Sequence, residues 1–305
     1  MSLKLLITGS SGFVGSNLSV YLKQLKLYKI VAFKRKEINI NLTNIDIIIH
    51  LAGKAHDLKN ISQPKDYYEA NYVLSKKLFD AFLVSSANVF IFMSSVKAAA
   101  DEVADILFED TEAKPKTHYG MSKRQAELYI LSKKIPPGKR VYILRPCMIH
   151  GPGNKGNLNL LYQLVNKGLP WPLGRFNNLR SFLSIENLCF VIKELLKNET
   201  ISSGIYNIAD NLPLSTNNLI QIIGQSLGKN PKVLNISTSI VQKIAKLGDS
   251  LNLPINTEKL QKLTDNYVVS NEKITAAIDE LLPVTSEEGL LRTFKSFDIK
   301  NQNSI

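Results

Sequence analysis

The chain has 305 residues, of which 44% are hydrophobic, and it carries a formal net charge of +12 at pH 7. This length suffices for one large domain or two smaller ones, and no apolar run reaches the length of a membrane span. The charge admits a nucleic acid, an acidic membrane surface or an anionic small substrate as partner. The scattered lysines and the lack of a nucleic-acid-binding motif disfavour the first of these, whereas a phosphorylated substrate would be attracted.

The first predicted element is an apolar strand over residues 3–8, followed by a glycine-rich loop and a helix over 12–25. This strand–loop–helix context is typical of a dinucleotide-binding fingerprint. Gly9 would allow the tight turn, Gly12 the approach of a pyrophosphate, and Gly15 the close packing of helix on strand. A purely structural loop is the alternative. The residues expected to bind the dinucleotide here are Gly9, Ser11, Gly12, Phe13 and Gly15.

The second strand, predicted over residues 29–33, leads into Lys34 and Arg35. An NAD-binding chain usually carries an acidic residue near this point to bind the adenosine ribose hydroxyls. Cations stand here instead, which slightly favours NADP over NAD. A solvated basic turn is an equally good explanation, so either cofactor is expected, with Lys34 and Arg35 as cofactor-binding candidates.

A short strand over residues 38–40 and a strand over 45–51 follow, and the latter runs into His50-Leu-Ala-Gly53. Ala52 and Gly53 are small enough for the backbone to line a cofactor, so Leu51, Ala52 and Gly53 are further cofactor-binding candidates. His50 is more often structural than catalytic at such a place. The four histidines lack zinc-like spacing, and we expect no metal site.

A long helix is predicted over residues 66–83 and a strand over 89–93, which ends at Ser94-Ser95. The next helix carries Tyr119 and Lys123, whose spacing of four residues puts a phenol and an ammonium on one face. A nearby positive charge lowers the pKa of a phenol, so this pair could exchange a proton with a substrate hydroxyl. An ordinary surface helix often carries such a pair too. A serine hydroxyl at the preceding strand end could bind the same substrate oxygen.

The last predicted strand of the first half, over residues 141–144, ends at Arg145-Pro146. Apolar strands that alternate with helices predict an α/β fold with a doubly wound, Rossmann-like parallel sheet. Beyond Gly151-Pro-Gly153 the loops lengthen, and short helices are predicted over 217–226, 239–247 and 286–295. We expect residues 1–155 plus about 181–208 to form the sheet domain, about 156–180 and 209–299 a smaller region over its carboxyl edge, and 300–305 a flexible tail.

The order and spacing of these motifs resemble those of the extended short-chain dehydrogenase/reductases, in particular the NAD-dependent epimerase/dehydratase branch. Within that branch, residues 50–56, 151–157 and 180–187 are similar to bacterial UDP-N-acetylhexosamine 4-epimerases and 4-keto-reductases of surface-polysaccharide pathways. The motifs that carry the resemblance are the glycine triplet, His50-Leu-Ala-Gly53, Asn71, Ser94-Ser95, Tyr119-x-x-x-Lys123 and Arg145-Pro146.

The resemblance implies a role for each matching residue. Tyr119 would be the acid and base, and Lys123 would hold the nicotinamide ribose and tune Tyr119. Ser95, with Ser94 beside it, would bind the reacting sugar oxygen, and Asn71 would brace the active-site helices. Pro146 would lie in the cofactor site. The substrate-binding residues would be Asn157 and Arg180 at the phosphates, and Trp171 and Leu173 near the base.

The implied reaction is hydride transfer at C4 of a UDP-hexose or UDP-N-acetylhexosamine, by a 4-epimerase or a 4-keto-reductase. A non-catalytic NAD(P)-binding regulatory or scaffold protein on the same fold is the alternative, although such proteins commonly lose the tyrosine–lysine pair. The resemblance also implies a homodimer, formed through helix 66–83 and the helix that carries Tyr119. The two cysteines lack metal-ligand spacing and are expected to be buried thiols in a reducing compartment, so we expect a cytoplasmic protein. No nucleic-acid partner is expected.

Overall fold

The computed structural model describes residues 2–33, 42–55, 63–154, 156, 158–251 and 256–302, with side chains described as far as Phe297 in the last range. Six parallel strands form its central sheet in the order β2-β1-β3-β4-β6-β9. The strand order reverses between β1 and β3, and ligands of doubly wound sheets bind at such a switch point. The predicted α/β fold is therefore confirmed. The strands are β1 (Leu3–Thr8), β2 (Tyr28–Ala32), β3 (Ile47–His50), β4 (Val89–Met93), β6 (Arg140–Pro146) and β9 (Gly204–Ile208).

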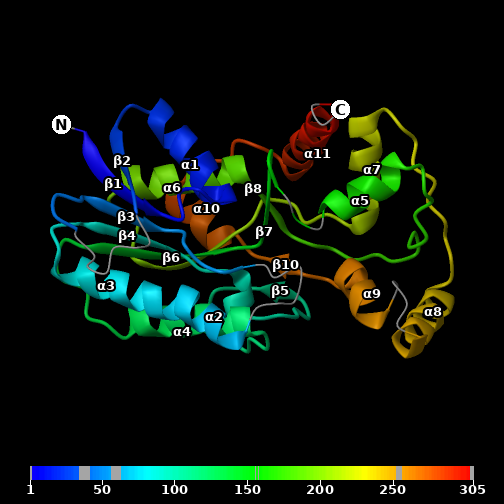
Figure 1. Ribbon diagram of the computed structural model, residues 1–305, viewed down its shortest axis with the longest axis horizontal. Helices are drawn as coiled ribbons and strands as arrows, with labels where there is room; N and C mark the ends of the chain where they lie inside the picture. The colour runs from blue at the N-terminus through cyan, green and yellow to red at the C-terminus, as the bar shows by residue number, and fades with distance from the viewer. Residues whose placement is uncertain are drawn as a thin grey trace.

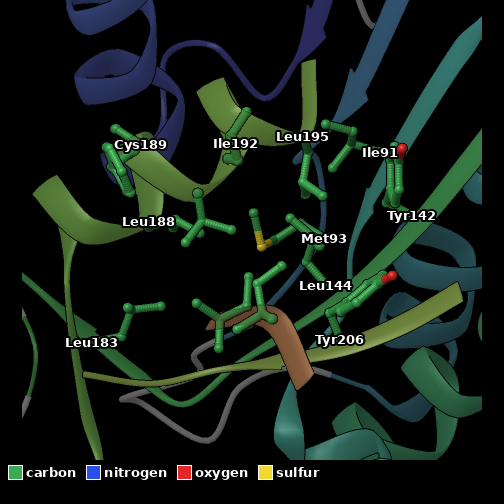
Figure 2. Close-up of a cluster of buried hydrophobic side chains, with 14 of the residues drawn as sticks. Ile91, Met93, Tyr142, Leu144, Leu183, Leu188, Cys189, Ile192, Leu195 and Tyr206 are labelled. Carbon is green, nitrogen blue, oxygen red and sulfur yellow. The ribbon is translucent and has the colours of Figure 1, made fainter. Parts of the chain in front are cut away.

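Helices cover both faces of this sheet (Figure 1). On one face lie α1 (Phe13–Gln24), α6 (Ile185–Lys197) and α10 (Glu272–Ile278), and on the other α3 (Leu74–Val84) and α4 (His118–Leu131). Figure 2 shows the core on the α6 side, where Met93 and Leu144 of the sheet meet Leu188 of α6. Each such side chain contributes about 1.5–3 kcal/mol on burial. The apolar strands are thus buried from both sides, as their sequences predict.

The remaining elements form a second packed group beside the carboxyl ends of the strands, at the right of Figure 1. Its core contains the aromatic side chains of Tyr162, Phe294 and Phe297 together with the buried Trp171. The elements of this part and of the connections to it are β5 (Ile106–Leu107), β7 (Met148–His150), α5 (Leu158–Asn166), β8 (Phe182–Ser184), α7 (Thr216–Leu227), α8 (Thr238–Leu251), α9 (Thr257–Thr264), β10 (Val268–Val269) and α11 (Ser286–Gln302).

Two predicted elements differ from the structure. The long helix expected over residues 66–83 consists of α2 (Pro64–Tyr68), a π-helical turn (Glu69–Val73) and α3. The tail expected from residue 300 is partly wrong, because α11 continues to Gln302. The short strand expected over residues 38–40 lies outside the described residues.

Candidate active site

Helix α4 brings Tyr119 and Lys123 to the edge of the sheet. Thr117 caps the helix by accepting a hydrogen bond from the Gly120 amide at 3.2 Å. Gly120 also permits close contact, since a Cβ there would lie 2.3 Å from the carbonyl oxygen of Lys97. The cap and this contact fix the first turn of α4 against the segment that follows β4.

Tyr119 and Ser95 meet at the carboxyl end of β4. Ser95 begins the 3-10 turn Val96–Ala98, and its hydroxyl accepts the Lys97 amide at 3.2 Å. Burial raises the pKa of the Tyr119 phenol above its ordinary value, while a hydrogen bond with Ser95 acts in the opposite direction. The expectation that Lys123 lowers this pKa is not met, because the Lys123 ammonium makes its contacts elsewhere. In this structure Tyr119 is therefore a protonated phenol at neutral pH.

Lys123 is almost fully buried and extends under the sheet edge. Its Nζ donates to the carbonyl oxygen of Met93 at 2.7 Å and lies 5.0 Å from the ring centroid of Phe92. Burial lowers the pKa of Lys123 to about 8, against the opposing effect of Glu127. A Cβ on Gly53 would lie 3.0 Å from Nζ, so the ammonium also adjoins the loop after β3. Lys123 thus presents its charge where the loop after β3 meets the end of β4.

Glu127, one turn beyond Lys123, holds a buried ion pair that joins α4 to the sheet. Arg145 donates from Nε to Oε1 at 2.9 Å and from Nη2 to Oε2 at 2.7 Å. Ser94 donates to Oε1 at 2.6 Å, and Arg124 to Oε2 at 3.2 Å. These donors satisfy both oxygens of the buried Glu127 carboxylate. The hydroxyl proton of Ser94 is directed to Glu127, whereas Ser95 bonds with Tyr119.

Asn71 lies in the π-helical turn and ties three segments together. Its Oδ1 accepts the Lys54 amide at 2.8 Å, and its Nδ2 donates to the Lys54 carbonyl and to the Ser122 hydroxyl, each at 3.0 Å. Ser122 in turn donates to the Tyr119 carbonyl at 2.9 Å. The fully buried amide side chain therefore fixes the loop after β3 to the first turn of α4.

His50 stands in a buried chain of hydrogen bonds from β1 to α3. Its Nδ1 lies 2.6 Å from the Thr8 hydroxyl and its Nε2 lies 2.8 Å from the Ser75 hydroxyl. Since Ser75 donates to the Asn71 carbonyl, Nε2 must carry the ring proton and Nδ1 must accept from Thr8. Burial lowers the pKa of His50 to about 3, so the ring is neutral and serves as a structural link.

The glycine loop has the geometry that its sequence predicts. Gly9 has a φ of +71°, which favours glycine, and a Cβ on Gly15 would lie 2.2 Å from the Gly9 carbonyl oxygen. Gly12 forms the N-cap of α1, so no side chain caps the helix, and its first turn holds no acid. Amide donors without a side-chain cap at a helix N-terminus attract phosphate. These features fit the pyrophosphate of a dinucleotide.

A family model for the NAD dependent epimerase/dehydratase family matches residues 5–209, which is more than half of the chain. The chain belongs to this family. A relative with similarity along the whole length is a UDP-glucose 4-epimerase of Vibrio cholerae, 27% identical and covering 97% of this chain and 96% of its own.

Further relatives extend the range of substrates within the family. An N-acetyl-alpha-D-glucosaminyl-diphospho-ditrans,octacis-undecaprenol 4-epimerase of Escherichia coli O157:H7 is 27% identical over 75% of this chain and 74% of its own. A UDP-glucuronic acid 4-epimerase of Bacillus cereus, solved in complex with NAD, superposes with a TM-score of 0.76 at 18% identity, covering 97% of this chain and 99% of its own. This structural likeness shows the shared fold.

The epimerase/dehydratase site of this chain also contains residues that the sequence did not single out. Glu127 lies four residues after Lys123, and Lys123 lies four residues after Tyr119. The repeated spacing places all three on one face of the helix and could have identified Glu127 as a site residue. Lys97 follows Ser95 by two residues. Its Nζ donates to the Asp101 carbonyl at 2.8 Å and lies 4.3 Å from the Tyr267 ring centroid.

Lys97 and Arg180 bring two positive charges close together beyond the end of β4. Burial lowers the pKa of Lys97, and the charge of Arg180 acts in the same direction. Arg180 donates to the carbonyl oxygens of Lys262 and Asp265, at 2.9 and 3.3 Å. In this structure the guanidinium therefore binds the C-terminal end of α9, within electrostatic reach of Lys97.

The other predicted binding residues divide into three groups. Pro146 ends β6, and Leu51 and Ala52 follow β3 at the same edge of the sheet. Trp171 and Leu173 are buried in the second core, where the indole donates to the Asn217 side chain at 2.8 Å. Their side chains are therefore not exposed to a base, and the backbone N–H and carbonyl of Trp171 bind Lys232 and Leu234. Lys34, Arg35 and Asn157 lie outside the described residues.

The described part of the chain offers no metal site and no membrane span. Among its residues, no three His, Cys, Asp or Glu side chains are grouped so that they could hold a metal ion. Within the same ranges, no helix has the length and apolar character needed to cross a membrane.

Proposed function

We propose that the protein catalyses NAD(P)-dependent hydride transfer at C4 of a UDP-hexose or UDP-N-acetylhexosamine, as a 4-epimerase or a 4-keto-reductase. The Tyr119 phenol, which interacts with the Ser95 hydroxyl at the edge of the sheet where Lys123 is buried, carries this proposal. It pairs a proton-transfer group with a second hydroxyl that can hold the same oxygen. The relative named UDP-glucose 4-epimerase, matched along both chains, supports the choice of substrate.

The proposed proton transfer takes place at the C4 oxygen of the sugar. In the oxidation direction Tyr119 acts as a phenolate, which takes the hydroxyl proton as the C4 hydride departs. In the reduction direction it acts as a phenol, which gives its proton to the C4 oxygen as hydride is delivered to the ketone. Ser95 binds the same oxygen and holds it at the phenol. When bound, a nicotinamide dinucleotide would supply the hydride chemistry. Lys123 would hold the ribose of the nicotinamide and would add positive charge that favours the phenolate.

The glycine loop and the loop after β3 are the proposed cofactor-binding surface. Gly9, Gly12 and Gly15 shape the turn for the pyrophosphate, and Leu51, Ala52, Gly53 and Pro146 lie along the same sheet edge. Ser11 and Phe13 frame the N-terminus of α1. Lys34 and Arg35 are proposed to favour NADP. We propose Ser94 as a structural neighbour of Ser95, because its proton is directed to Glu127.

The second packed group is the proposed substrate-binding region, from about residue 156 to 180 and from 209 to 299. Arg180 and Lys97 supply cations for the substrate diphosphate, since an arginine fork binds phosphate oxygens in pairs. To bind the diphosphate, the Arg180 guanidinium would release the carbonyl oxygens at the C-terminal end of α9 and donate to the phosphate oxygens instead. Asn157 would assist at the phosphates, and the backbone of residues 171–173 would lie beside the base.

The deciding assay incubates the purified protein with UDP-N-acetylglucosamine and with UDP-glucose and analyses the products by NMR. A galacto product formed without added cofactor identifies a 4-epimerase that retains its nucleotide. No epimerisation, but NADPH or NADH oxidation with a UDP-4-keto sugar, identifies a reductase. Because one relative acts on a polyprenyl-diphosphate sugar, the same assay includes that carrier.

Replacement of Tyr119 by Phe tests the chemistry directly. Loss of the phenolic proton should reduce turnover about 10²- to 10⁴-fold, while nucleotide binding persists. The matched control is Tyr129→Phe on the same helix, whose hydroxyl donates to Asp80 at 2.5 Å rather than to the site. Equal turnover in Tyr119→Phe and the native chain would contradict the proposal, and nucleotide binding by the native chain without any turnover would favour the non-catalytic alternative.

A further inference from the structure

Helix α8 carries an apolar stripe that the described residues leave uncovered. Ile240, Ile244, Leu247 and Leu251 are 53%, 48%, 60% and 66% exposed. They recur at intervals of four, three and four residues, so they lie along one side of the helix. The buried face of α8, formed by Val241, Ala245 and Gly248, is a separate line beside this stripe. Packing against the described residues therefore does not explain why the apolar stripe is exposed.

The other large apolar side chains exposed in the described residues do not form such a line on one helix. Val20 on α1 and Leu281 after α10, at 59% and 88%, stand singly. Scattered apolar residues are normal on a protein surface, whereas a continuous stripe marks a contact site. Four residues spread over twelve positions extend about 16 Å along a helix. The stripe is thus long enough to lie along a surface rather than to fill a small pocket.

Lysines stand beside the stripe. Lys243 and Lys246 are exposed on α8, and neither has an acidic partner among the described residues. The acid of this helix, Asp249, accepts hydrogen bonds from Thr257 and is turned toward α9. From Lys229 to the end of α9 at Thr264 the chain has six lysines and two acids, a net charge of +4. An apolar face flanked by lysines matches an anionic lipid surface, which offers both acyl chains and phosphate groups.

The position of α8 leaves the stripe accessible. The helix lies at the end of the molecule opposite to β2, at the lower right of Figure 1, and packs against α9. The carbonyl oxygens at the end of α9 bind Arg180, which the proposed function places at the substrate diphosphate. A surface bound at α8 would therefore lie near the substrate region and away from the glycine loop. A second copy of this chain fits less well, because a symmetric contact would bring Lys243 and Lys246 of both copies together.

We propose that α8 binds the surface of a membrane rich in anionic phospholipid, with its axis in the plane of the membrane. The stripe of Ile240, Ile244, Leu247 and Leu251 enters the headgroup boundary, and Lys243 and Lys246 bind the lipid phosphates. The helix lies on the membrane and does not cross it. This surface acts independently of the hydride transfer, so the inference holds whether or not the proposed reaction is correct.

Sedimentation of the full chain with vesicles tests the proposal without any sugar substrate. The native chain should sediment with vesicles of phosphatidylglycerol and phosphatidylcholine, but not with phosphatidylcholine alone, and high salt should release it. The double change Ile244→Gln with Leu247→Gln should abolish binding, because glutamine keeps helix propensity while removing the apolar contact. The change Lys243→Gln with Lys246→Gln should weaken binding on the order of 20-fold, about fivefold for each lysine.

A matched control replaces Val20 and Leu281, which are also exposed but lie elsewhere, by Gln. This variant should bind vesicles as the native chain does, and circular dichroism should show all variants folded. Failure of the native chain to sediment with anionic vesicles would overturn the proposal, as would binding that none of the α8 changes weakens. So would an assembly of several copies that Ile244→Gln with Leu247→Gln dissociates in the absence of lipid.

Discussion

Burial shifts the two ionisable groups of α4 in opposite directions. It raises the pKa of the Tyr119 phenol and lowers that of the Lys123 ammonium to about 8, so each group is driven toward its neutral form. A neutral phenol is the form that protonates a ketone oxygen, and a charged Lys123 is the form that stabilises a phenolate. At neutral pH Lys123 is still mostly charged, since its pKa is about 8, whereas Tyr119 is a neutral phenol. Bound cofactor and substrate must therefore lower the phenol pKa before a proton can move from the sugar to Tyr119.

The lowered pKa of Lys123 predicts how the free energy of unfolding depends on pH. The folded chain releases this proton near pH 8, whereas the unfolded chain keeps it until about pH 10.5. Between these pH values the unfolded state binds more protons than the folded state, so the contribution of Lys123 to stability rises with pH. The free energy of unfolding of the native chain should rise relative to that of Lys123→Met by up to about 3 kcal/mol between pH 8 and 10.5. Urea denaturation of both proteins without cofactor at about pH 7.5 and 9.5 measures their free energies of unfolding. A difference between the two proteins that is the same at both pH values would contradict the prediction.

The adjacent serines should separate activity from stability. Ser95→Ala removes the hydroxyl that bonds with Tyr119, and should lower turnover about tenfold or more with little effect on folding. Ser94→Ala leaves Glu127 without one of its donors, and should cost about 1–3 kcal/mol of stability. Turnover and urea denaturation of both variants make the comparison. Equal effects on turnover would reject the assignment of different roles.

At the scale of single residues, the sequence predicts which face of a helix a side chain occupies better than which atoms it contacts. The spacing of Tyr119 and Lys123 follows from helix geometry and is observed. In this structure Lys123 is not among the causes that shift the phenol pKa, because its flexible side chain binds the Met93 carbonyl instead. Spacing along a helix fixes which face a residue occupies, but not where the end of a long side chain goes.

At the scale of elements, the Arg145–Glu127 pair joins β6 to α4 and so positions the helix that carries Tyr119. Arg145 is 1% exposed, and its hydrogen bonds to Glu127 measure 2.9 and 2.7 Å. Arg145→Met alone leaves the Glu127 carboxylate buried with fewer partners and should destabilise the fold by about 3–5 kcal/mol.

The double change Arg145→Met with Glu127→Leu removes the unpaired charge and should recover much of that loss. Urea denaturation of the single and double variants measures both values. A double variant as unstable as Arg145→Met would show that packing of the arginine stem, rather than its charge, holds the two elements together.

The strands of the sheet follow from apolar runs, which predict β1 and β4 at their observed bounds. The π-helical turn at Asn71 could not be predicted in this way. Its cause is tertiary, since the buried Asn71 side chain bonds both backbone groups of Lys54, a residue 17 positions away. Regular hydrophobic spacing gives no sign of such a contact, so a continuous helix was the natural expectation.

At the scale of the whole molecule, α3 and α4 present an outer surface suited to a homodimer. Val84 and Leu128 are 89% and 51% exposed, and the two helices lie side by side on the face of the sheet away from α1 and α6. We expect sedimentation velocity to show a dimer at micromolar concentration, and Leu128→Glu to dissociate it. The surface change Leu281→Glu is the control. A native chain that stays monomeric would reject this assembly.

The sheet domain is easier to predict than the rest of the molecule for a physical reason. Its parallel strands are buried on both sides and therefore appear as apolar runs, and its loops carry the glycine and Tyr–Lys motifs. Beyond Gly151 the strands β8 and β10 have only three and two residues. The second core depends on contacts between distant segments, such as Trp171 with Asn217, which local patterns do not reveal.

The order of strands in the sheet also bears on synthesis of the chain. Strand β6, which carries Arg145, pairs with β4 on one side and with β9 on the other. Because β9 ends at Ile208, β6 remains a bare edge until the ribosome has extended the chain well beyond Tyr119 and Lys123. A nascent chain that pauses in α6 would expose a long apolar edge to other chains. Chaperone capture during translation is therefore expected to concentrate on this interval, between the completion of β6 and that of β9.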